Sequence, residues 1–135
     1  MLKLLQKLGY FPKTAVWELT LGCNLQCRHC GSRAGKARGD ELTDDELFAL
    51  ADELIDLGLE RVTLSGGEPT LHPRWADLGE HLVGQGIKVN MISNGLTWDE
   101  TRARRAKVAG FSSVAFSVDG FEEAHDYIRG VNGGY

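Results

Sequence analysis

Residues 15–30 read AVWELTLGCNLQCRHC and join a strand-forming run to three closely spaced cysteines. The run is rich in β-strand formers and stops at Gly22, which predicts a strand followed by a loop. Cys23, Cys27 and Cys30 then lie in that loop, and they are the only cysteines of the chain. Three thiols so close together can hold one face of a small metal centre but leave one coordination position without a protein ligand. We therefore expect a reactive centre at the end of this strand.

The sequence after the cysteines alternates strand and helix signals, with glycines at several boundaries. Runs of strand-forming residues recur at 61–65, 88–94 and 113–119. Capping signals and the spacing of apolar residues predict helices at 43–57, 74–83 and 99–109. Because each helix separates two strands, the pattern favours right-handed βαβ crossovers and a parallel sheet.

The predicted strands carry polar residues on one face and apolar residues on the other. The polar positions are Glu18, Thr20, Thr63, Ser65, Asn90, Asn94, Ser117 and Asp119. The apolar positions are Trp17, Leu19, Val62, Leu64, Val89, Met91, Val114 and Phe116. Strands buried on both faces of a flat sheet would be apolar throughout, so we expect helices over the apolar face and a concave, polar interior. The predicted fold class is α/β, a partial (β/α) TIM-type barrel of about four parallel strands, open and incomplete.

The predicted organisation is a lead-in at residues 1–14 followed by one core domain at residues 15–135. An eightfold (β/α) barrel needs roughly 200 residues or more. We therefore expect this chain to be the N-terminal portion of a larger enzyme or a truncated product.

Composition excludes several classes of protein. The formal net charge of −4 gives no reason to expect nucleic acid or an anionic membrane as a partner. No apolar run approaches the length of a membrane span, and the N-terminal residues lack the features of a signal peptide. An odd, tightly grouped set of cysteines is unlike the framework of a secreted disulfide protein, so we expect a cytoplasmic location.

A second motif, Gly66-Gly67-Glu68-Pro69, follows the predicted strand at 61–65. Paired glycines let the backbone approach a ligand closely, and the glutamate offers an anionic acceptor. The C-x3-C-x2-C loop together with this GGEP turn resembles the N-terminal core of the radical S-adenosylmethionine (SAM) superfamily, over residues 17–130. The segment HDYIRG at 125–130 is similar to members that carry a SPASM or twitch extension.

The resemblance implies a 4Fe–4S cluster held at three irons by Cys23, Cys27 and Cys30, with SAM chelating the fourth. Reductive cleavage of SAM would give a 5′-deoxyadenosyl radical that abstracts hydrogen from a substrate. Similar members modify peptides or make peptide-derived cofactors, so a peptide is the expected substrate, and a flavodoxin- or ferredoxin-like protein is the expected electron donor. Auxiliary clusters have no ligands in this sequence, because no cysteine follows Cys30.

The same resemblance implies a set of cofactor-binding residues: Gly66, Gly67, Glu68, Pro69, Asn94, Ser117, Asp119 and Arg129. The GGEP turn would bind the methionyl amine, and the polar side chains at the strand ends would bind the methionyl and ribose parts. Arg129 would pair with a cofactor carboxylate. His29 stands where the superfamily often has an aromatic residue near the adenine.

Other interpretations of these residues remain open. The three thiols could hold zinc or be incidental buried cysteines, although zinc would need a fourth ligand that His29, between two cysteines, is badly placed to supply. Asn94 and Asp119 each precede a glycine and could serve only as turn formers. Arg129 could be a surface arginine. A different class of function is a non-catalytic iron–sulfur module that works beside another chain.

Overall fold

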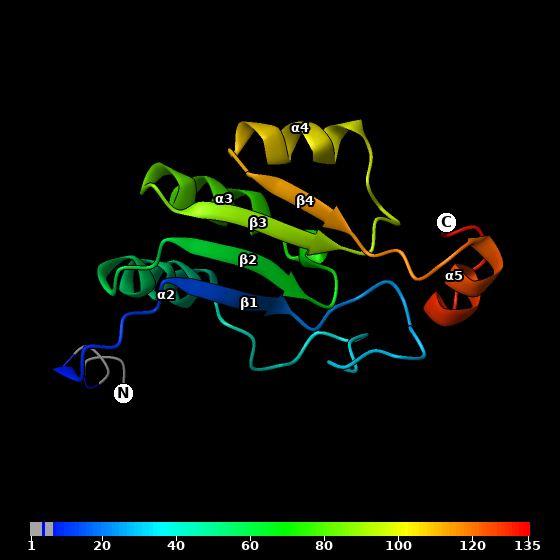
Figure 1. Ribbon diagram of the computed structural model, residues 1–135, viewed down its shortest axis with the longest axis horizontal. Helices are drawn as coiled ribbons and strands as arrows, with labels where there is room; N and C mark the ends of the chain where they lie inside the picture. The colour runs from blue at the N-terminus through cyan, green and yellow to red at the C-terminus, as the bar shows by residue number, and fades with distance from the viewer. Residues whose placement is uncertain (1–3, 5–6) are drawn as a thin grey trace.

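The computed structural model describes residue 4 and residues 7–135, so residues 1–3 and 5–6 of the predicted lead-in lie outside the described part. Its elements are, in order, β1 (Thr14–Thr20), α2 (Asp44–Asp56), β2 (Arg61–Gly66), the 3₁₀ helix η1 (Pro69–Leu71), α3 (Trp75–Gly84), β3 (Lys88–Ser93), α4 (Glu100–Val108), β4 (Ser113–Phe116) and α5 (Glu122–Arg129). The four strands form one parallel sheet in the order β1-β2-β3-β4 (Figure 1). The predicted open, parallel α/β architecture is confirmed.

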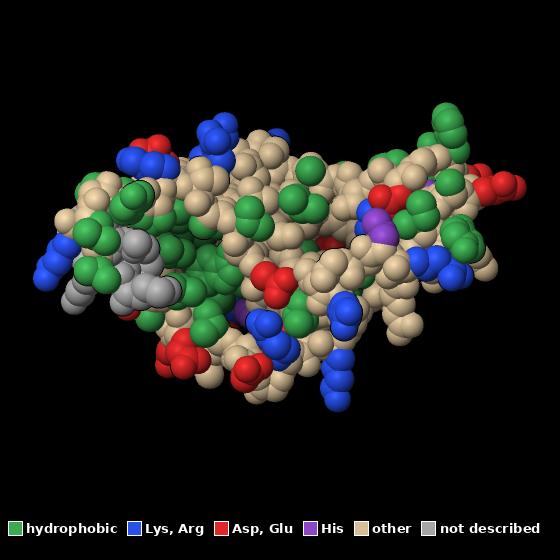
Figure 2. Space-filling model, turned by 60° about the horizontal axis from the view of Figure 1, so that its bottom comes forward, with side chains coloured by type: hydrophobic (Ala, Val, Ile, Leu, Met, Phe, Trp, Pro, Cys, Tyr) green, Lys and Arg blue, Asp and Glu red, His purple; other side chains and the backbone are tan. Residues whose placement is uncertain are grey.

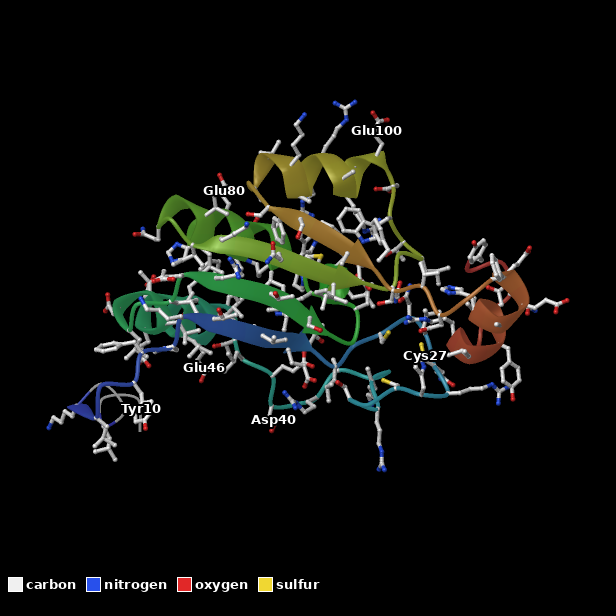
Figure 3. The ribbon with its side chains drawn as sticks, viewed as in Figure 1. Tyr10, Cys27, Asp40, Glu46, Glu80 and Glu100 are labelled. Carbon is white, nitrogen blue, oxygen red and sulfur yellow. The ribbon has the colours of Figure 1, made fainter. Side chains whose placement is uncertain are left out.

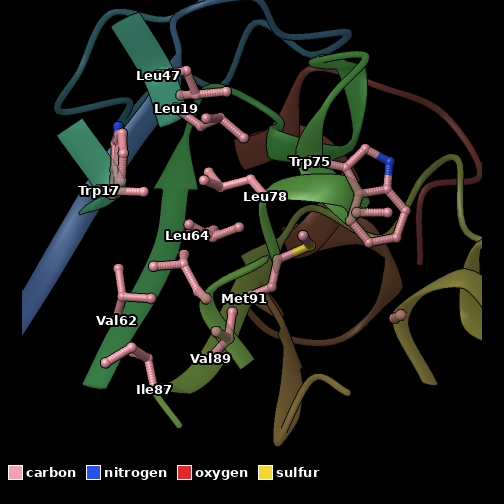
Figure 4. Packing of buried hydrophobic residues seen from close by; sticks show 14 of the residues in the cluster. Trp17, Leu19, Leu47, Val62, Leu64, Trp75, Leu78, Ile87, Val89 and Met91 are labelled. Carbon is pink, nitrogen blue, oxygen red and sulfur yellow. The ribbon is translucent and has the colours of Figure 1, made fainter. Parts of the chain in front are cut away.

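The hydrophobic core lies between the sheet and the helices α2 and α3, which cover one of its faces (Figures 1 and 4). Its strand residues are Trp17, Leu19, Val62, Leu64, Val89 and Met91, all predicted for the apolar face. The helices contribute Leu47, Ala51, Trp75, Leu78 and Leu82. On the opposite face, Val16 and Ile92 remain exposed beside the polar positions. This second face is therefore left open, as the strand pattern predicts.

Helix α2 begins with the predicted capping box. The Thr43 hydroxyl accepts from the backbone N–H of Glu46, whose side chain in turn accepts from the backbone N–H of Thr43. The chain leaves the end of this helix through Gly58, whose φ of +91° suits a residue without a side chain. These two signals fix where the first crossover begins and ends.

Strand β4 is shorter than predicted. It ends at Phe116 and not at Asp119, because its pairing with β3 runs only to the Ser93–Phe116 pair. Ser117 and Asp119 consequently lie in the segment that follows the strand. Phe116 was predicted beneath the helices, but it is 51% exposed and meets the ring of Trp98 edge-on at 5.3 Å. As an edge strand paired only with β3, β4 receives less cover than its neighbours.

Helix α5 was not predicted, and it matters for the site. It lies at the carboxyl ends of the strands (Figure 1). Its N-cap residue is Phe121, which makes no side-chain capping hydrogen bond, so the sequence carried no capping signal for this helix. Gly130, with a φ of +69°, ends the helix in the left-handed conformation. The helix therefore places residues 122–129 against the loop that carries the cysteines.

Charged side chains of both signs are interspersed over the face shown in Figure 2. Within the part of the chain that the structure describes, no helix is both long and apolar enough to cross a membrane.

Candidate metal and cofactor site

The cysteine loop leaves the carboxyl end of β1 and folds back against it. The backbone N–H of Gly35 donates to the carbonyl of Leu21 at 2.9 Å, and that of Cys23 donates to the carbonyl of Gly35 at 3.0 Å. These bonds close the loop before the next helix begins. The thiols are thus held at the end of the sheet by backbone geometry.

Glu41 fastens the returning arm of this loop to β1. Its carboxylate accepts from the backbone N–H of Leu21 at 2.8 Å, from that of Arg38 at 3.1 Å and from the Thr20 hydroxyl. Burial raises the pKa of Glu41, but these hydrogen bonds together outweigh it and lower the pKa below its ordinary value. Sequence reasoning missed Glu41, whose only signal was an acidic residue after a basic, glycine-rich segment.

Cys23, Cys27 and Cys30 are free thiols of intermediate exposure, and all three line one cavity of about 350 Å³. The cavity opens at the carboxyl ends of the strands, where Figure 3 shows Cys27 beside α5. Other predicted site residues line the same cavity: Gly66, Gly67, Asn94, Ser117 and Arg129. The structure therefore brings together most of the residues that the sequence singled out. Glu68, Pro69 and Asp119 do not line the cavity.

The donor set of this cavity, three thiols, fits an iron–sulfur cluster. Among the residues that the structure describes, no three His, Cys, Asp or Glu side chains converge closely enough to form a ready-made ion site. All three cysteines line the same cavity, and soft thiolates are the ligands that iron–sulfur clusters take. Three protein ligands would leave one iron of a four-iron cluster open to a further ligand.

Each cysteine sulfur has its own N–H donor. Asn94 Nδ2 lies 3.8 Å from Cys23 Sγ, and Arg129 Nη1 lies 3.8 Å from Cys27 Sγ. The backbone N–H of residue 34 donates to Cys30 Sγ at 3.3 Å. Burial raises the pKa of the Cys23 thiol, and the hydrogen bonds from residue 25 and Asn94 offset this only in part. Hydrogen bonds of this kind stabilise sulfur that carries negative charge.

The Gly66-Gly67 turn packs directly against the base of the cysteine loop. A Cβ on Gly66 would lie 2.3 Å from the carbonyl oxygen of Thr20, and one on Gly67 would lie 2.2 Å from that of Gly22. Gly66 also has a φ of +131°, which L side chains rarely adopt. The sequence predicted that glycines here let the backbone approach a ligand. The structure shows that they let the turn pack against the backbone of Thr20 and Gly22.

The structure corrects the expected orientation of Glu68. Its side chain is fully buried, and the carboxylate accepts from the Thr70 hydroxyl, from the Ser93 hydroxyl and from the backbone N–H of Asn94 at 2.8 Å. A carboxylate so engaged is not the free anionic acceptor that the sequence suggested. It ties the turn after β2 to the end of β3. Ser93, which completes this arrangement, was missed because its partner lies 25 residues earlier.

Asn94 is a turn-forming residue that also contacts the cysteine loop. Its Oδ1 accepts from the backbone N–H of Leu96 at 2.9 Å, as in a turn-forming asparagine. Its Nδ2 donates to Asn24 Oδ1 at 2.8 Å and approaches Cys23. The side chain therefore joins the end of β3 to the first cysteine of the loop.

Asp119, Arg129 and His29 form a charged group beside Cys27. Asp119 forms an ion pair with the Arg129 guanidinium, and its Oδ1 lies 3.3 Å from His29 Nε2. Arg129 is only 9% exposed, so it is not the surface arginine that the sequence also allowed. The His29 side chain is about half exposed, and the residue lines the cavity.

Arg28 fastens α5 to the cysteine loop. Its backbone N–H donates to the carbonyl of Ile128 at 2.8 Å, and its Nε donates to the carbonyl of Tyr127 at 2.9 Å. The guanidinium also lies 4.2 Å from the centre of the Tyr127 ring. Donors at the last carbonyls of a helix stabilise its C-terminus, so these contacts set the position of Arg129.

Fold and site together define an open (β/α) half-barrel protein with a three-thiol site at the carboxyl ends of its strands. Residues 17–135 match the Radical SAM superfamily, and the chain belongs to this family. The resemblance inferred from the cysteine loop and the GGEP turn is confirmed.

Curated relatives and solved structures agree with this assignment. The chain is 34% identical to an AdoMet-dependent heme synthase of Methanosarcina barkeri, over 92% of this chain and 36% of that protein. It is 32% identical to the sporulation killing factor maturation protein SkfB of Bacillus subtilis, over 94% of this chain and 31% of SkfB. The AdoMet-bound structure of anSMEcpe matches with a TM-score of 0.70 and 25% identity, over 87% of this chain and 35% of that one. The chain thus spans about a third of the length of these proteins.

Proposed function

We propose that this chain holds a 4Fe–4S cluster through Cys23, Cys27 and Cys30 and binds SAM in the adjoining cavity. The observation that carries the proposal is that one cavity is lined by all three thiols, the Gly66-Gly67 turn and the polar ends of β3 and β4. When bound, the cluster would supply the one electron needed to cleave SAM into methionine and a 5′-deoxyadenosyl radical, which would take a hydrogen atom from a substrate.

The chain's own residues position these groups. Gly66 and Gly67 are half-buried and line the cavity, so their backbone offers a surface for the methionyl end of SAM. Asn94 and Ser117 bring polar side chains from the adjacent strand ends. Glu68 acts indirectly, because its buried carboxylate holds the turn and the backbone of Asn94 in register.

We also propose a peptide substrate and a flavodoxin- or ferredoxin-like electron donor. The similarity to SkfB, named as a maturation protein, supports a peptide, and the fold matches SuiB solved with its precursor peptide SuiA at a TM-score of 0.78. The similarity to AdoMet-dependent heme synthases makes a tetrapyrrole the alternative substrate. An external donor is needed because each cleavage of SAM consumes one electron.

Anaerobic reconstitution tests the proposal. The wild-type chain should bind about four irons and show sulfur-to-iron absorbance, as this cluster type requires. With dithionite and SAM it should release 5′-deoxyadenosine, measured by chromatography, and a variant with all three cysteines replaced by alanine should do neither. Iron uptake without cleavage would favour the non-catalytic iron–sulfur module. A colourless preparation with stoichiometric zinc would refute the cluster.

A further inference from the structure

Arg129 brings a cationic N–H donor, whose guanidinium is also paired with Asp119, to one of the three cysteine sulfurs. Its Nη1 lies 3.8 Å from Cys27 Sγ, whereas Cys23 meets the neutral amide of Asn94 and Cys30 meets a backbone N–H. The arginine is 9% exposed, so its charge acts where water screens it poorly. The three ligand positions are therefore electrostatically unequal, and Cys27 is the position beside the cation.

The guanidinium is held in this position from two sides. Asp119 pairs with its Nε edge, which leaves Nη1 on the side of the sulfur. The backbone of the neighbouring Ile128 is fixed by its bond from Arg28, which belongs to the same loop as Cys27. The Asp119 carboxylate already partly neutralises the guanidinium of Arg129. Arg129 is therefore poorly suited to bind a second carboxylate, that of SAM, which the sequence led us to expect as its partner.

We propose that Arg129 is a positioning residue that supports the Cys27 ligand and raises the reduction potential of the cluster. This inference rests on the proposed function, because it requires a cluster on the three cysteines. Reduction adds negative charge to the cluster and its thiolates, so a cationic N–H donor stabilises the reduced form more than the oxidised form. Hydrogen bonds to the sulfurs are among the features that set the potentials of such clusters.

The test measures the midpoint potential of the reconstituted cluster in the absence of SAM. Wild type, R129Q, R129K and R33Q are titrated anaerobically and followed by electron paramagnetic resonance. R129Q should shift to a more negative potential, by about a tenfold fall in the equilibrium constant for one-electron reduction, or about 59 mV. R129K, which keeps the charge but not the planar fork, should lie between R129Q and wild type. R33Q removes an equal charge from an exposed position of the same loop and should match wild type.

The outcomes separate this inference from the proposed function. A wild-type chain without a cluster would overturn both. A wild-type cluster combined with an unshifted R129Q would overturn the inference alone, and weakened SAM binding in that variant would then assign Arg129 to the cofactor carboxylate. Loss of the cluster from R129Q without SAM, with an unchanged circular dichroism spectrum and a normal R33Q cluster, would support a role at the sulfur. A residue that serves only SAM is not needed to retain the cluster.

Discussion

Replacing Gly67 with alanine should separate the turn after β2 from the cysteine loop. The added Cβ would lie 2.2 Å from the carbonyl oxygen of Gly22 and 2.8 Å from that of Leu21, and these backbone atoms cannot rotate away. Relieving the overlap breaks the bonds from Gly67 N–H to Thr20 at 2.7 Å and from Glu68 N–H to Gly22 at 2.8 Å. Each bond contributes about 1 kcal/mol and overpacking costs about 1–3 kcal/mol, so the free energy of unfolding should fall by about 3–5 kcal/mol.

Urea unfolding of the metal-free protein, followed by tryptophan fluorescence, measures this loss without involving the cluster. Gly84→Ala is the matched control, because Gly84 is the exposed last residue of α3 and its added Cβ would meet nothing within 4 Å. That variant should be neutral or gain up to about 1 kcal/mol from helix propensity. An unfolding midpoint of Gly67→Ala equal to that of wild type would refute the close backbone contact between turn and loop.

Three further changes probe other parts of the site. Cys30→Ala should abolish iron retention after anaerobic reconstitution, and full iron content would remove Cys30 from the ligand set. Glu68→Gln should lower the free energy of unfolding by roughly 1–3 kcal/mol, because an amide NH₂ would face buried donors such as Ser93; equal stability in urea would argue against the buried network. Glu41, whose pKa is lowered in the folded state, should contribute stability above its ordinary pKa near 4.5 that is lost as the pH falls through the folded value. In Glu41→Gln the free energy of unfolding should therefore fall less as the pH is lowered below 4.5, as measured by urea unfolding at several pH values. The same pH dependence in this variant and in wild type would contradict the contribution of Glu41.

The sequence predicted the first three strands well because the signals that define them are local. Glycines follow β1 and β2 closely, and the alternation of apolar and polar residues identifies the buried face without knowledge of neighbours. Strand β4 was overextended for the same reason, since its alternation continues after Phe116 although its pairing with β3 stops there. The end of a strand depends on its partner, which is a property of tertiary structure.

In the candidate site, too, features with a local sequence signal could be predicted, and contacts between distant segments could not. The cysteines and the paired glycines could be found because their spacing along the chain is itself the signal. The orientation of Glu68 could not, because it depends on Ser93 and Asn94 at the end of another strand. The ion pair between Asp119 and Arg129 depends on α5, whose start carries no capping residue.

The bond from Arg28 to Ile128 has a consequence for how the protein is made. The ribosome delivers the thiols about a hundred residues before the helix that packs over them, as the separation of 99 positions between Arg28 and Tyr127 indicates. Until that helix emerges, the nascent sulfurs lack their late cover and stay open to oxidants and stray metals. Iron loading should therefore be most selective once α5 has emerged, and a chain released before that point should bind stray metals more readily.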